Sequence, residues 1–431
     1  MSDSQTQDIC AQDSENAKVK LQSPSWFKDL QLLPPEKIYS LNRQFKADDY
    51  EHKLDFAFPC YRDENGKPWV FPVVRQAETV LANDGSLNKK RLEPFGYKTF
   101  NSYALTLLLG ENSSARVKNQ AFTIQTIGLT GTIRTGAEFL VKCLKMTTVY
   151  GTEQNVDQVD KTFLEAGFQK YKTLRYFNNY TLSLDERGLL EDLARAPSRS
   201  VIFLQVSGHD PTGIDPSHEL WEKIANIMKT NELFPFFYSG FQGFATGNLN
   251  EDAEPVRLFE RQGLEFLCVQ TFAWNFGLFN DRCGSLTIVL NDTNQINPVK
   301  SHLRDIITRL YSTPPSHGAR IVAFILGDRM LSEEWTKTIS AIADRLRKMR
   351  LYLREELQRL RAPGTWNHLT RQVGMFSYTG LRQIQVQHLK KQHHIYLLDD
   401  GRMNVSGLNL DNVQYIAMAI NQTLTIIPPM L

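Results

Sequence analysis

The stretch SVIFLQVSGHDPTGID, from Ser200 to Asp215, contains the pattern that decides the fold. Its first seven residues, to Val206, form a mainly apolar run typical of a buried strand, and the glycines and proline that follow predict a loop. Asp215 and Pro216 predict the start of a helix, as its N-cap and first helical residue. A strand, a loop and a helix in this order are typical of an α/β sheet.

The same alternation continues outward from this stretch. Between residues 69 and 290, short apolar runs such as Phe234–Tyr238 and Phe266–Val269 alternate with helical patterns, which predicts a large, mostly parallel sheet with helices on both faces. Apolar residues at spacings of three and four predict one long helix from Ser332 to Arg361. Beyond it we expect three short strands and a final helix, at Gly374–Tyr378, His394–Leu398, Met403–Ser406 and Asp411–Gln422.

These patterns divide the chain into several segments. We expect a disordered tail at 1–22, a large α/β domain at 69–331, and a smaller α+β domain formed by 36–68 and 332–431, which includes the long helix. Apolar side chains gather at 23–35, in a segment too short to bury them alone. From the pattern alone, this segment lies either on its own domain or on a partner subunit.

Composition excludes several classes of function. The 431 residues carry a net charge of +2, and 22% of them are charged, which gives no electrostatic basis for binding nucleic acid or an anionic membrane. No apolar stretch reaches the ~18 residues of a membrane span. The five cysteines are odd in number and have no close pair, which favours free thiols and a cytoplasmic location. No metal site is expected, because His393 and His394 lack the spacing of metal ligands.

Several unusual strings occur at consistent spacing: His209–Asp215, Leu233–Gly247, Gln270–Gly284, Pro314–Ala323, Pro363–Tyr378 and His394–Asn404. On these strings the chain resembles the aspartate aminotransferases, class I enzymes that depend on pyridoxal phosphate, and the cytosolic form is nearest. The resemblance implies the fold type I architecture and a homodimer with active sites at the interface, in which the arm at 23–35 packs on the partner subunit. It also implies the family reaction, in which L-aspartate and 2-oxoglutarate give oxaloacetate and L-glutamate.

Trp274 lies where the family has the lysine that holds the cofactor as an imine. An aminotransferase needs that amine to form the imine and to move a proton, whereas an indole N–H is only a hydrogen-bond donor. The sequence contains no lysine between Lys229 and Lys300, so no neighbouring residue replaces it. We therefore expect that pyridoxal phosphate is not bound covalently and that this chain has no catalytic residue.

The positions that contact the cofactor ring in the family have changed as well. Tyr238 replaces the aspartate that keeps the ring nitrogen protonated, and a phenol with a pKa near 10 cannot supply that charge. Asp210 and Phe241 replace an asparagine and a tyrosine, and Val156 replaces the stacking tryptophan. Trp274 is expected to fill the vacated ring site as an apolar plug.

The positions of the family's phosphate site are better kept. Thr130 and Gly131 are expected to open a helix whose free N–H groups favour an anion. Thr271 and Arg282 lie where the family's hydroxyl and arginine hold phosphate. Arg91 replaces the tyrosine that the partner subunit contributes.

One of the two substrate arginines of the family is kept. Arg402 matches the arginine that binds the α-carboxylate of the substrate, a bidentate contact that lysine makes poorly. The arginine for the distal carboxylate falls at Thr308. Arg282 and Arg402 either bind a ligand or form ion pairs inside the fold.

Three functions are compatible with these residues. The first is a relative of cytosolic aspartate aminotransferase that has lost catalysis and acts as a structural or regulatory homodimer, or as a heterodimer with an active paralogue. The second is a binding module for a small anion or amino acid. The third is a transaminase that remains active by another route.

Overall fold

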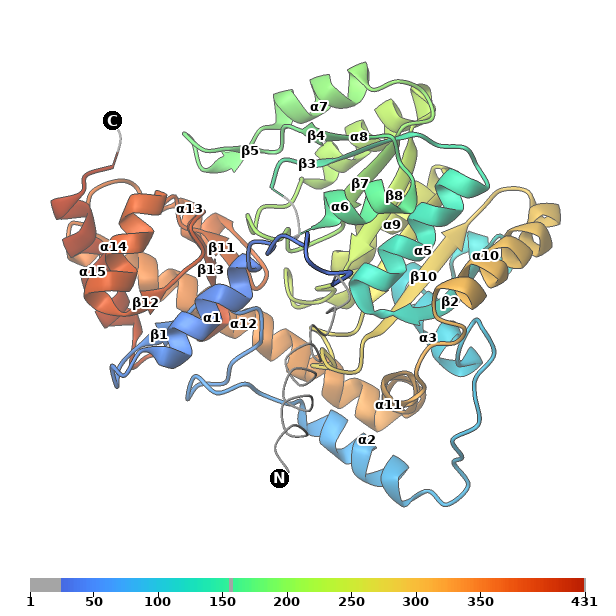
Figure 1. Cartoon of the computed structure of the whole chain (residues 1–431), viewed down its shortest axis with the longest axis horizontal. Helices are drawn as coiled ribbons and strands as arrows, with labels where there is room; N and C mark the ends of the chain where they lie inside the picture. The colour runs from blue at the N-terminus through green and yellow to red at the C-terminus, as the bar shows by residue number, and fades with distance from the viewer. Residues whose placement is uncertain (1–24, 155–157, 430–431) are drawn as a thin grey trace, which may run out of the picture.

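The core of the molecule is a seven-stranded sheet. The computed structural model describes residues 25–154 and 158–429. The strands lie in the order β2 (Ala121–Ile127), β10 (Cys283–Val289), β9 (Phe266–Thr271), β8 (Phe234–Ser239), β7 (Val201–Gln205), β3 (Thr148–Thr152) and β4 (Lys170–Leu174). Only β10 runs antiparallel to its neighbours, and helices cover both faces of the sheet (Figure 1). The predicted fold class, a large and mostly parallel sheet with a smaller α+β part, is confirmed.

Successive residues of β8 show why its sequence is a continuous apolar run. Phe236 packs edge-on against Phe163 of α6 (Val159–Ala166) at 5.6 Å between ring centres, on the face that α5 (Gly128–Lys142) also covers. Phe237 points the other way, to Phe259 of α9 (Leu249–Arg261) at 4.9 Å and toward α8 (His218–Thr230). A strand buried on both faces has no polar side to alternate with.

The remaining elements around the large sheet are short helices and one hairpin. The hairpin is formed by β5 (Phe177–Asn178) and β6 (Ser183–Leu184). The helices are α2 (Pro72–Asn83), α3 (Lys98–Leu109), α4 (Ser114–Val117), α7 (Glu186–Arg195), the 3-10 helix η1 (Thr293–Gln295), α10 (Ile296–Leu310) and α11 (His317–Gly327).

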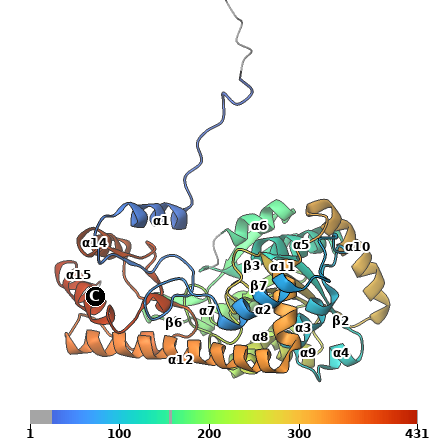
Figure 2. The same cartoon turned by 90° about the horizontal axis from the view of Figure 1, so that it is seen from below.

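The smaller α+β part contains two pairs of short strands. The strand β1 (Leu54–Asp55) pairs in parallel with β12 (Ile395–Tyr396), and β11 (Phe376–Tyr378) pairs antiparallel with β13 (Arg402–Asn404). Its helices are α1 (Lys37–Ala47), α13 (His368–Arg371), α14 (Gln383–His393), the 3-10 helix η2 (Val405–Gly407) and α15 (Val413–Ile426). The long helix α12 (Arg329–Arg359) runs beneath both parts of the molecule, and it contacts α11 at one end and α15 at the other (Figure 2). The segment boundaries given above remain a prediction.

The predicted start of α8 was wrong. The helix begins at His218, with the Ser217 hydroxyl accepting a hydrogen bond from a backbone N–H of the first turn. The Asp215 carboxylate instead turns back and accepts hydrogen bonds from the N–H groups of Gly208 and His209, at 2.6 and 2.9 Å. It therefore stabilises the preceding loop and does not cap the helix.

Other boundaries shifted by a few residues. The long helix begins at Arg329, before the predicted Ser332, because the Asp328 carboxylate caps it by accepting a hydrogen bond from the Leu331 N–H at 2.9 Å. The three short strands near the end of the chain are present but shorter than predicted, and the final helix continues to Ile426. In the described residues, four cysteines are free thiols: Cys60, Cys143, Cys268 and Cys283.

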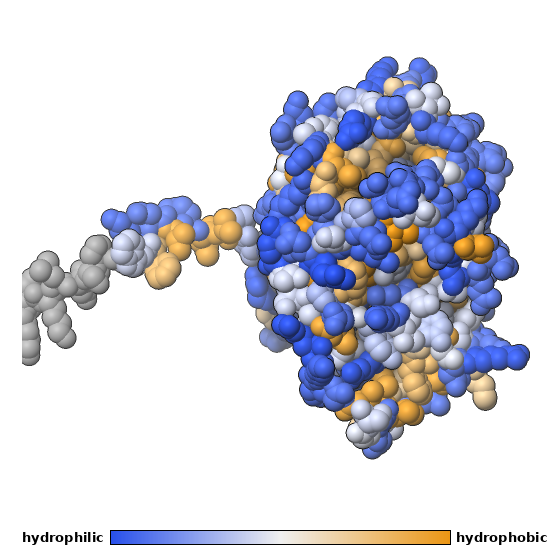
Figure 3. Space-filling view, turned by 90° about the vertical axis from the view of Figure 1, so that its right-hand side faces the viewer, coloured by the Kyte–Doolittle hydropathy of each residue, from blue (hydrophilic) through white to orange (hydrophobic). Residues whose placement is uncertain are grey.

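The arm at 23–35 is described from residue 25 onward, and its side chains are exposed. Trp26 and Leu32 are each 98% accessible, and Leu33 is 80% accessible. Figures 2 and 3 show the segment standing away from the body of the chain, with apolar side chains along it. Contact with a partner subunit remains a prediction. Across residues 25–154 and 158–429, no helix has both the length and the apolar character needed to cross a membrane.

Candidate functional site

Three of the sequence-predicted site residues follow neighbouring parallel strands. Asp210 comes after β7, Tyr238 lies at the end of β8, and Trp274 comes after β9. The carboxyl ends of parallel strands meet at one edge of a sheet, where open α/β folds bind their ligands. The structure therefore brings these three residues to the expected edge.

Trp274 lies in an aromatic stack. Its indole ring is 5.2 Å from the Phe241 ring at an interplanar angle of 16°, and 5.1 Å from the Phe279 ring. The indole is half-buried, and its Nε1 has no hydrogen-bond partner of acceptable geometry among the described residues. The ring is therefore held mainly by contacts with other rings.

The loop that carries Trp274 is held by contacts with α12. The Trp335 indole donates a hydrogen bond to the Asn275 carbonyl at 2.7 Å, and it stacks on Phe276 at 4.4 Å. Gly277, at a φ of +67°, turns the chain so that its N–H donates to the Trp274 carbonyl at 3.2 Å. These contacts leave Trp274 little freedom to move out of the site.

Tyr238 is buried and carries no charge. Burial is the main cause of a strongly raised pKa of its phenol, and the Asp210 carboxylate adds to that rise. The nearby Trp274 indole opposes the rise without reversing it. A neutral phenol in this position offers a hydrogen bond but no negative charge.

Asp210 and Arg402 form an ion pair. Nη1 of Arg402 lies 2.9 Å from Oδ1 of Asp210, and their side chains are only 8% and 9% exposed. The guanidinium of Arg402 also lies 5.5 Å from the centre of the Phe376 ring. The structure thus shows an ion pair for Arg402 inside the fold, and the binding of a ligand carboxylate by Arg402 remains a prediction.

Arg282 lies at the amino end of α5. That helix begins at Gly128, so Thr130 and Gly131 lie within its first turn and do not open it as predicted. Gly128 has a φ of +63°, and a Cβ on it would be 3.0 Å from Nε of Arg282, so the guanidinium lies directly over this residue. The guanidinium also lies 5.5 Å from the centre of the Phe279 ring.

The electrostatics of this corner favour an anion. Arg282 and Thr130 are both exposed, and we find no hydrogen bond or ion pair to the Arg282 guanidinium from any described residue. The N–H groups in the first turn of α5 add the positive end of a helix. Thr271 is buried beside this corner, and its hydroxyl donates a long hydrogen bond of 3.5 Å to the Cys283 carbonyl.

Two predicted positions, Arg91 and Thr308, are not brought to the site in the described part of this chain, and a third cannot be placed there. Val156 lies outside the described residues. Arg91 is exposed in the loop between α2 and α3, and no hydrogen bond or ion pair joins it to the other site residues in the described parts. Thr308 is exposed on α10, where its hydroxyl donates to the Arg304 carbonyl.

Sequence reasoning missed several residues that shape the site. Phe279 contacts both Trp274 and Arg282, and the density of aromatic residues at 272–279 was the available signal. His209 was also missed: its buried ring stacks on Tyr176 at 4.1 Å, and burial lowers the pKa of the imidazole to about 3. Burial raises the pKa of Asp215 to about 6.

The residues present fit only part of pyridoxal phosphate. Its phosphate matches the corner formed by Arg282 and the first turn of α5. The ring end does not fit: the described residues offer there an indole stacked on Phe241 and the neutral phenol of Tyr238, and neither group can form an imine or supply a negative charge. No chemical step through the cofactor is therefore derived for this chain.

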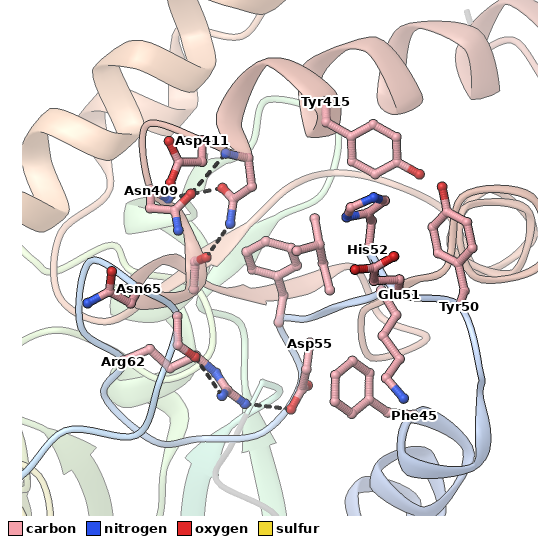
Figure 4. A pocket seen from close by; sticks show the side chains of 16 residues that line it. Phe45, Tyr50, Glu51, His52, Asp55, Arg62, Asn65, Asn409, Asp411 and Tyr415 are labelled. Atoms are coloured by element: carbon pink, nitrogen blue, oxygen red, sulfur yellow. Dashed lines mark hydrogen bonds and ion pairs between the residues drawn. The ribbon is translucent and has the colours of Figure 1, made fainter.

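A separate cavity of about 580 Å³ lies in the smaller α+β part (Figure 4). It is lined by side chains from α1, β1 and α15, among them Phe45, Asp55 and Tyr415. An ion pair at its wall joins Asp55 to Arg62 at 2.7 Å. None of the predicted site residues lines this cavity.

Comparison with known proteins gives one consistent result. Residues 51–420 match the model of the family described as aminotransferase class I and II. The chain is 41% identical over 397 residues to the cytoplasmic aspartate aminotransferase of Gallus gallus. The aligned region covers 91% of this chain and 96% of the relative. The structure superposes on the cytoplasmic aspartate aminotransferase of Saccharomyces cerevisiae with a TM-score of 0.89 and 35% identity, over 93% of this chain and 99% of that one.

A third match is an aromatic-amino-acid aminotransferase from Burkholderia pseudomallei described as covalently bound to pyridoxal phosphate. Its TM-score is 0.90 with 30% identity, over 93% of this chain and 100% of that one. The family model, the sequence relative and the two solved structures agree. The chain therefore belongs to the class I and II aminotransferase family, as a homologue of the aspartate aminotransferases.

Proposed function

We propose that this homologue of the aspartate aminotransferases has lost transamination and serves as a structural or regulatory subunit. The observation that carries the proposal is the indole of Trp274, stacked on Phe241 at 5.2 Å, at the position where the resemblance places the family's cofactor lysine. An indole forms no imine and accepts no proton at its nitrogen. Pyridoxal phosphate would accordingly not be held covalently.

The surrounding strands offer no substitute amine. None of β2, β7, β8, β9 or β10 contains a lysine. Loss of a general base alone costs about two to four powers of ten in rate, and loss of the covalent anchor adds to that. The neutral Tyr238 removes the charge that would hold a ring nitrogen protonated, so two independent requirements of the family reaction are missing.

The proposed assembly is a cytoplasmic homodimer, or a heterodimer with an active paralogue. The relatives from Gallus gallus and Saccharomyces cerevisiae are both described as cytoplasmic. The exposed apolar arm, with Trp26 and Leu32 each 98% accessible, supports a contact with a second subunit. An inactive subunit could then stabilise or regulate its partner without chemistry of its own.

The test uses the purified chain with pyridoxal phosphate. We expect no transamination of L-aspartate with 2-oxoglutarate, and no cofactor retained on the chain after borohydride reduction and gel filtration. A borohydride-fixed cofactor at one residue, together with measurable transamination, would overturn the proposal and establish the family reaction in its place. The wild-type enzyme from a cytoplasmic relative is the positive control.

A second candidate function is the non-covalent binding of a small anion. The exposed guanidinium of Arg282 over the first residue of α5 favours it. Binding to the folded state alone raises the melting temperature. We expect inorganic phosphate and pyridoxal phosphate to raise it and pyridoxal, which lacks the phosphate, to leave it unchanged. Equal shifts with pyridoxal and its phosphate would exclude an anion site at this corner.

A further inference from the structure

We propose that Asp210 acts as a resident carboxylate for Arg402. Its carboxylate pairs with the guanidinium that a small carboxylate ligand would bind. The pair also joins the sheet edge to the smaller α+β part. The inference concerns carboxylate selectivity and is independent of the chemistry at Trp274.

The ion pair connects residues that are distant in the sequence. Asp210 follows β7 of the large sheet, Arg402 begins β13 of the smaller part, and they are 192 positions apart. Both side chains are less than 10% exposed, so water screens their attraction weakly. A buried guanidinium needs an anionic partner, and the chain itself provides one.

Arg402 is held in place from its own side. Its N–H donates to Oδ1 of Asp400 at 3.0 Å, and the carbonyl of the preceding residue, Gly401, accepts a hydrogen bond from the Thr379 hydroxyl at 2.8 Å. The Phe376 ring lies under the guanidinium at 5.5 Å. The pairing of β11 with β13 and these contacts therefore help to direct the guanidinium toward Asp210.

A second contact joins the same two parts of the molecule. The hairpin of β5 and β6 reaches the smaller part, where Phe177 packs edge-on against Tyr378 at 5.2 Å. Leu182 of the same hairpin lies against Gly380, where an added Cβ would be 2.9 Å from its side chain. The two parts are therefore in contact at this hairpin as well as at the Asp210–Arg402 pair.

A cavity also borders Arg402. A cavity of about 260 Å³ is lined by Arg402 and by residues of α1 and α14, including Lys37 and Lys390. The carboxylates of Asp399 and Asp400 lie in the same wall. We expect a small carboxylate to approach Arg402 from this cavity, where the two lysines favour an anion.

The test measures binding of succinate, a dicarboxylate without an amine, by calorimetry in the absence of cofactor. We expect Asp210→Asn to bind succinate at least tenfold more tightly than the wild-type chain, because a neutral amide competes for the guanidinium less strongly than a carboxylate does. The matched control is Asp55→Asn, which breaks the Asp55–Arg62 pair inside the smaller part (Figure 4). It should leave succinate affinity unchanged, and Asp210→Asn with Arg402→Gln should lose the gain.

Each other outcome decides against the proposal. Equal affinity for succinate in wild type and Asp210→Asn would show that Asp210 does not compete with ligand. A gain that survives Arg402→Gln would place the binding elsewhere. Asp210→Ala provides a second route should the Asn variant lose its near-ultraviolet circular dichroism. If both Asp210 variants fail to fold while Asp55→Asn folds, the carboxylate is a folding requirement and the proposal is wrong.

Discussion

At one end of the candidate site, Arg282 lies exposed over the first residue of α5. At the other end, Trp274 stacks on Phe241 beside the buried phenol of Tyr238. The first end depends on one cation and on the N–H groups of a helix, which any sequence with this fold presents. The second end depends on particular side chains. Anion binding can therefore outlast catalysis in the same molecule, because single exchanges remove an amine or a carboxylate but not a helix terminus.

The largest expected effect comes from returning an amine to the ring end. Trp274→Lys should gain a cofactor that borohydride fixes to residue 274, where the wild-type chain gains none, because the new amine can form an imine. Mass spectrometry of the reduced and digested protein locates the adduct. Trp26→Lys, in the exposed arm, is the control for labelling of any added lysine. If residue 274 stays unlabelled, the geometry of the loop, and not the missing amine alone, prevents imine formation at the ring end.

A pH experiment examines the loop that carries Asp210 at the ring end. The pKa of Asp215 is raised to about 6 by burial, so its contribution to stability is lost as pH rises from about 4 to 6. The pKa of His209 is lowered to about 3, so its contribution is lost as pH falls through the same range. The two slopes oppose each other in the wild-type chain.

In Asp215→Asn, of these two pH dependences only the one caused by His209 should remain in the free energy of unfolding. Relative to wild type, the free energy of unfolding of the variant should rise by roughly 1.4 kcal/mol per pH unit between pH 4 and 6, or about 3 kcal/mol in all. Urea titrations at three pH values measure it. Asp185→Asn, which removes the N-cap carboxylate of α7, is the control. Parallel curves for wild type and Asp215→Asn would contradict the raised pKa.

The next effect concerns the phosphate end. Arg282→Gln should weaken binding of inorganic phosphate by about ten- to a hundredfold, since a hydrogen bond to a charged group contributes roughly 1.5–3 kcal/mol. Arg304→Gln is the matched control, because Arg304 is also exposed and lies over an aromatic ring, that of Phe95 at 5.1 Å, but on α10. Equal loss in both variants would mean that phosphate binds to general surface charge.

The smallest expected effect is the free energy by which Phe241 stabilises the Trp274 ring in the site. A double-mutant cycle of Trp274→Leu and Phe241→Leu should give a coupling free energy of about 0.5–1.5 kcal/mol, the range for stacked aromatic pairs beyond their buried area. Chemical unfolding of the wild-type chain, the two single variants and the double variant supplies the four values needed. A coupling near zero would show that the indole occupies the site without being stabilised by Phe241.

The sheet was predictable because strands buried on both faces leave continuous apolar runs, as β7 and β8 do. The role of Asp215 was not, because the same carboxylate can cap a helix or satisfy the N–H groups of a preceding loop. Only burial in the folded chain decides between the two. The partner of Arg402 was equally open, since it lies 192 residues away and across two parts of the fold.

The long helix α12 has a consequence for how the molecule could be observed. Near its amino end Trp335 holds the Asn275 carbonyl, next to Trp274, and toward its other end it contacts α15. The helix therefore connects the loop under the ring site, at one end, with the smaller part of the molecule at the other. Trp335, stacked on Phe276, is a built-in fluorophore at the end of the helix that lies under the ring site. The chain contains six tryptophans, so the part of an emission change on adding phosphate or succinate that is lost in Trp335→Phe would report a change at this end of α12.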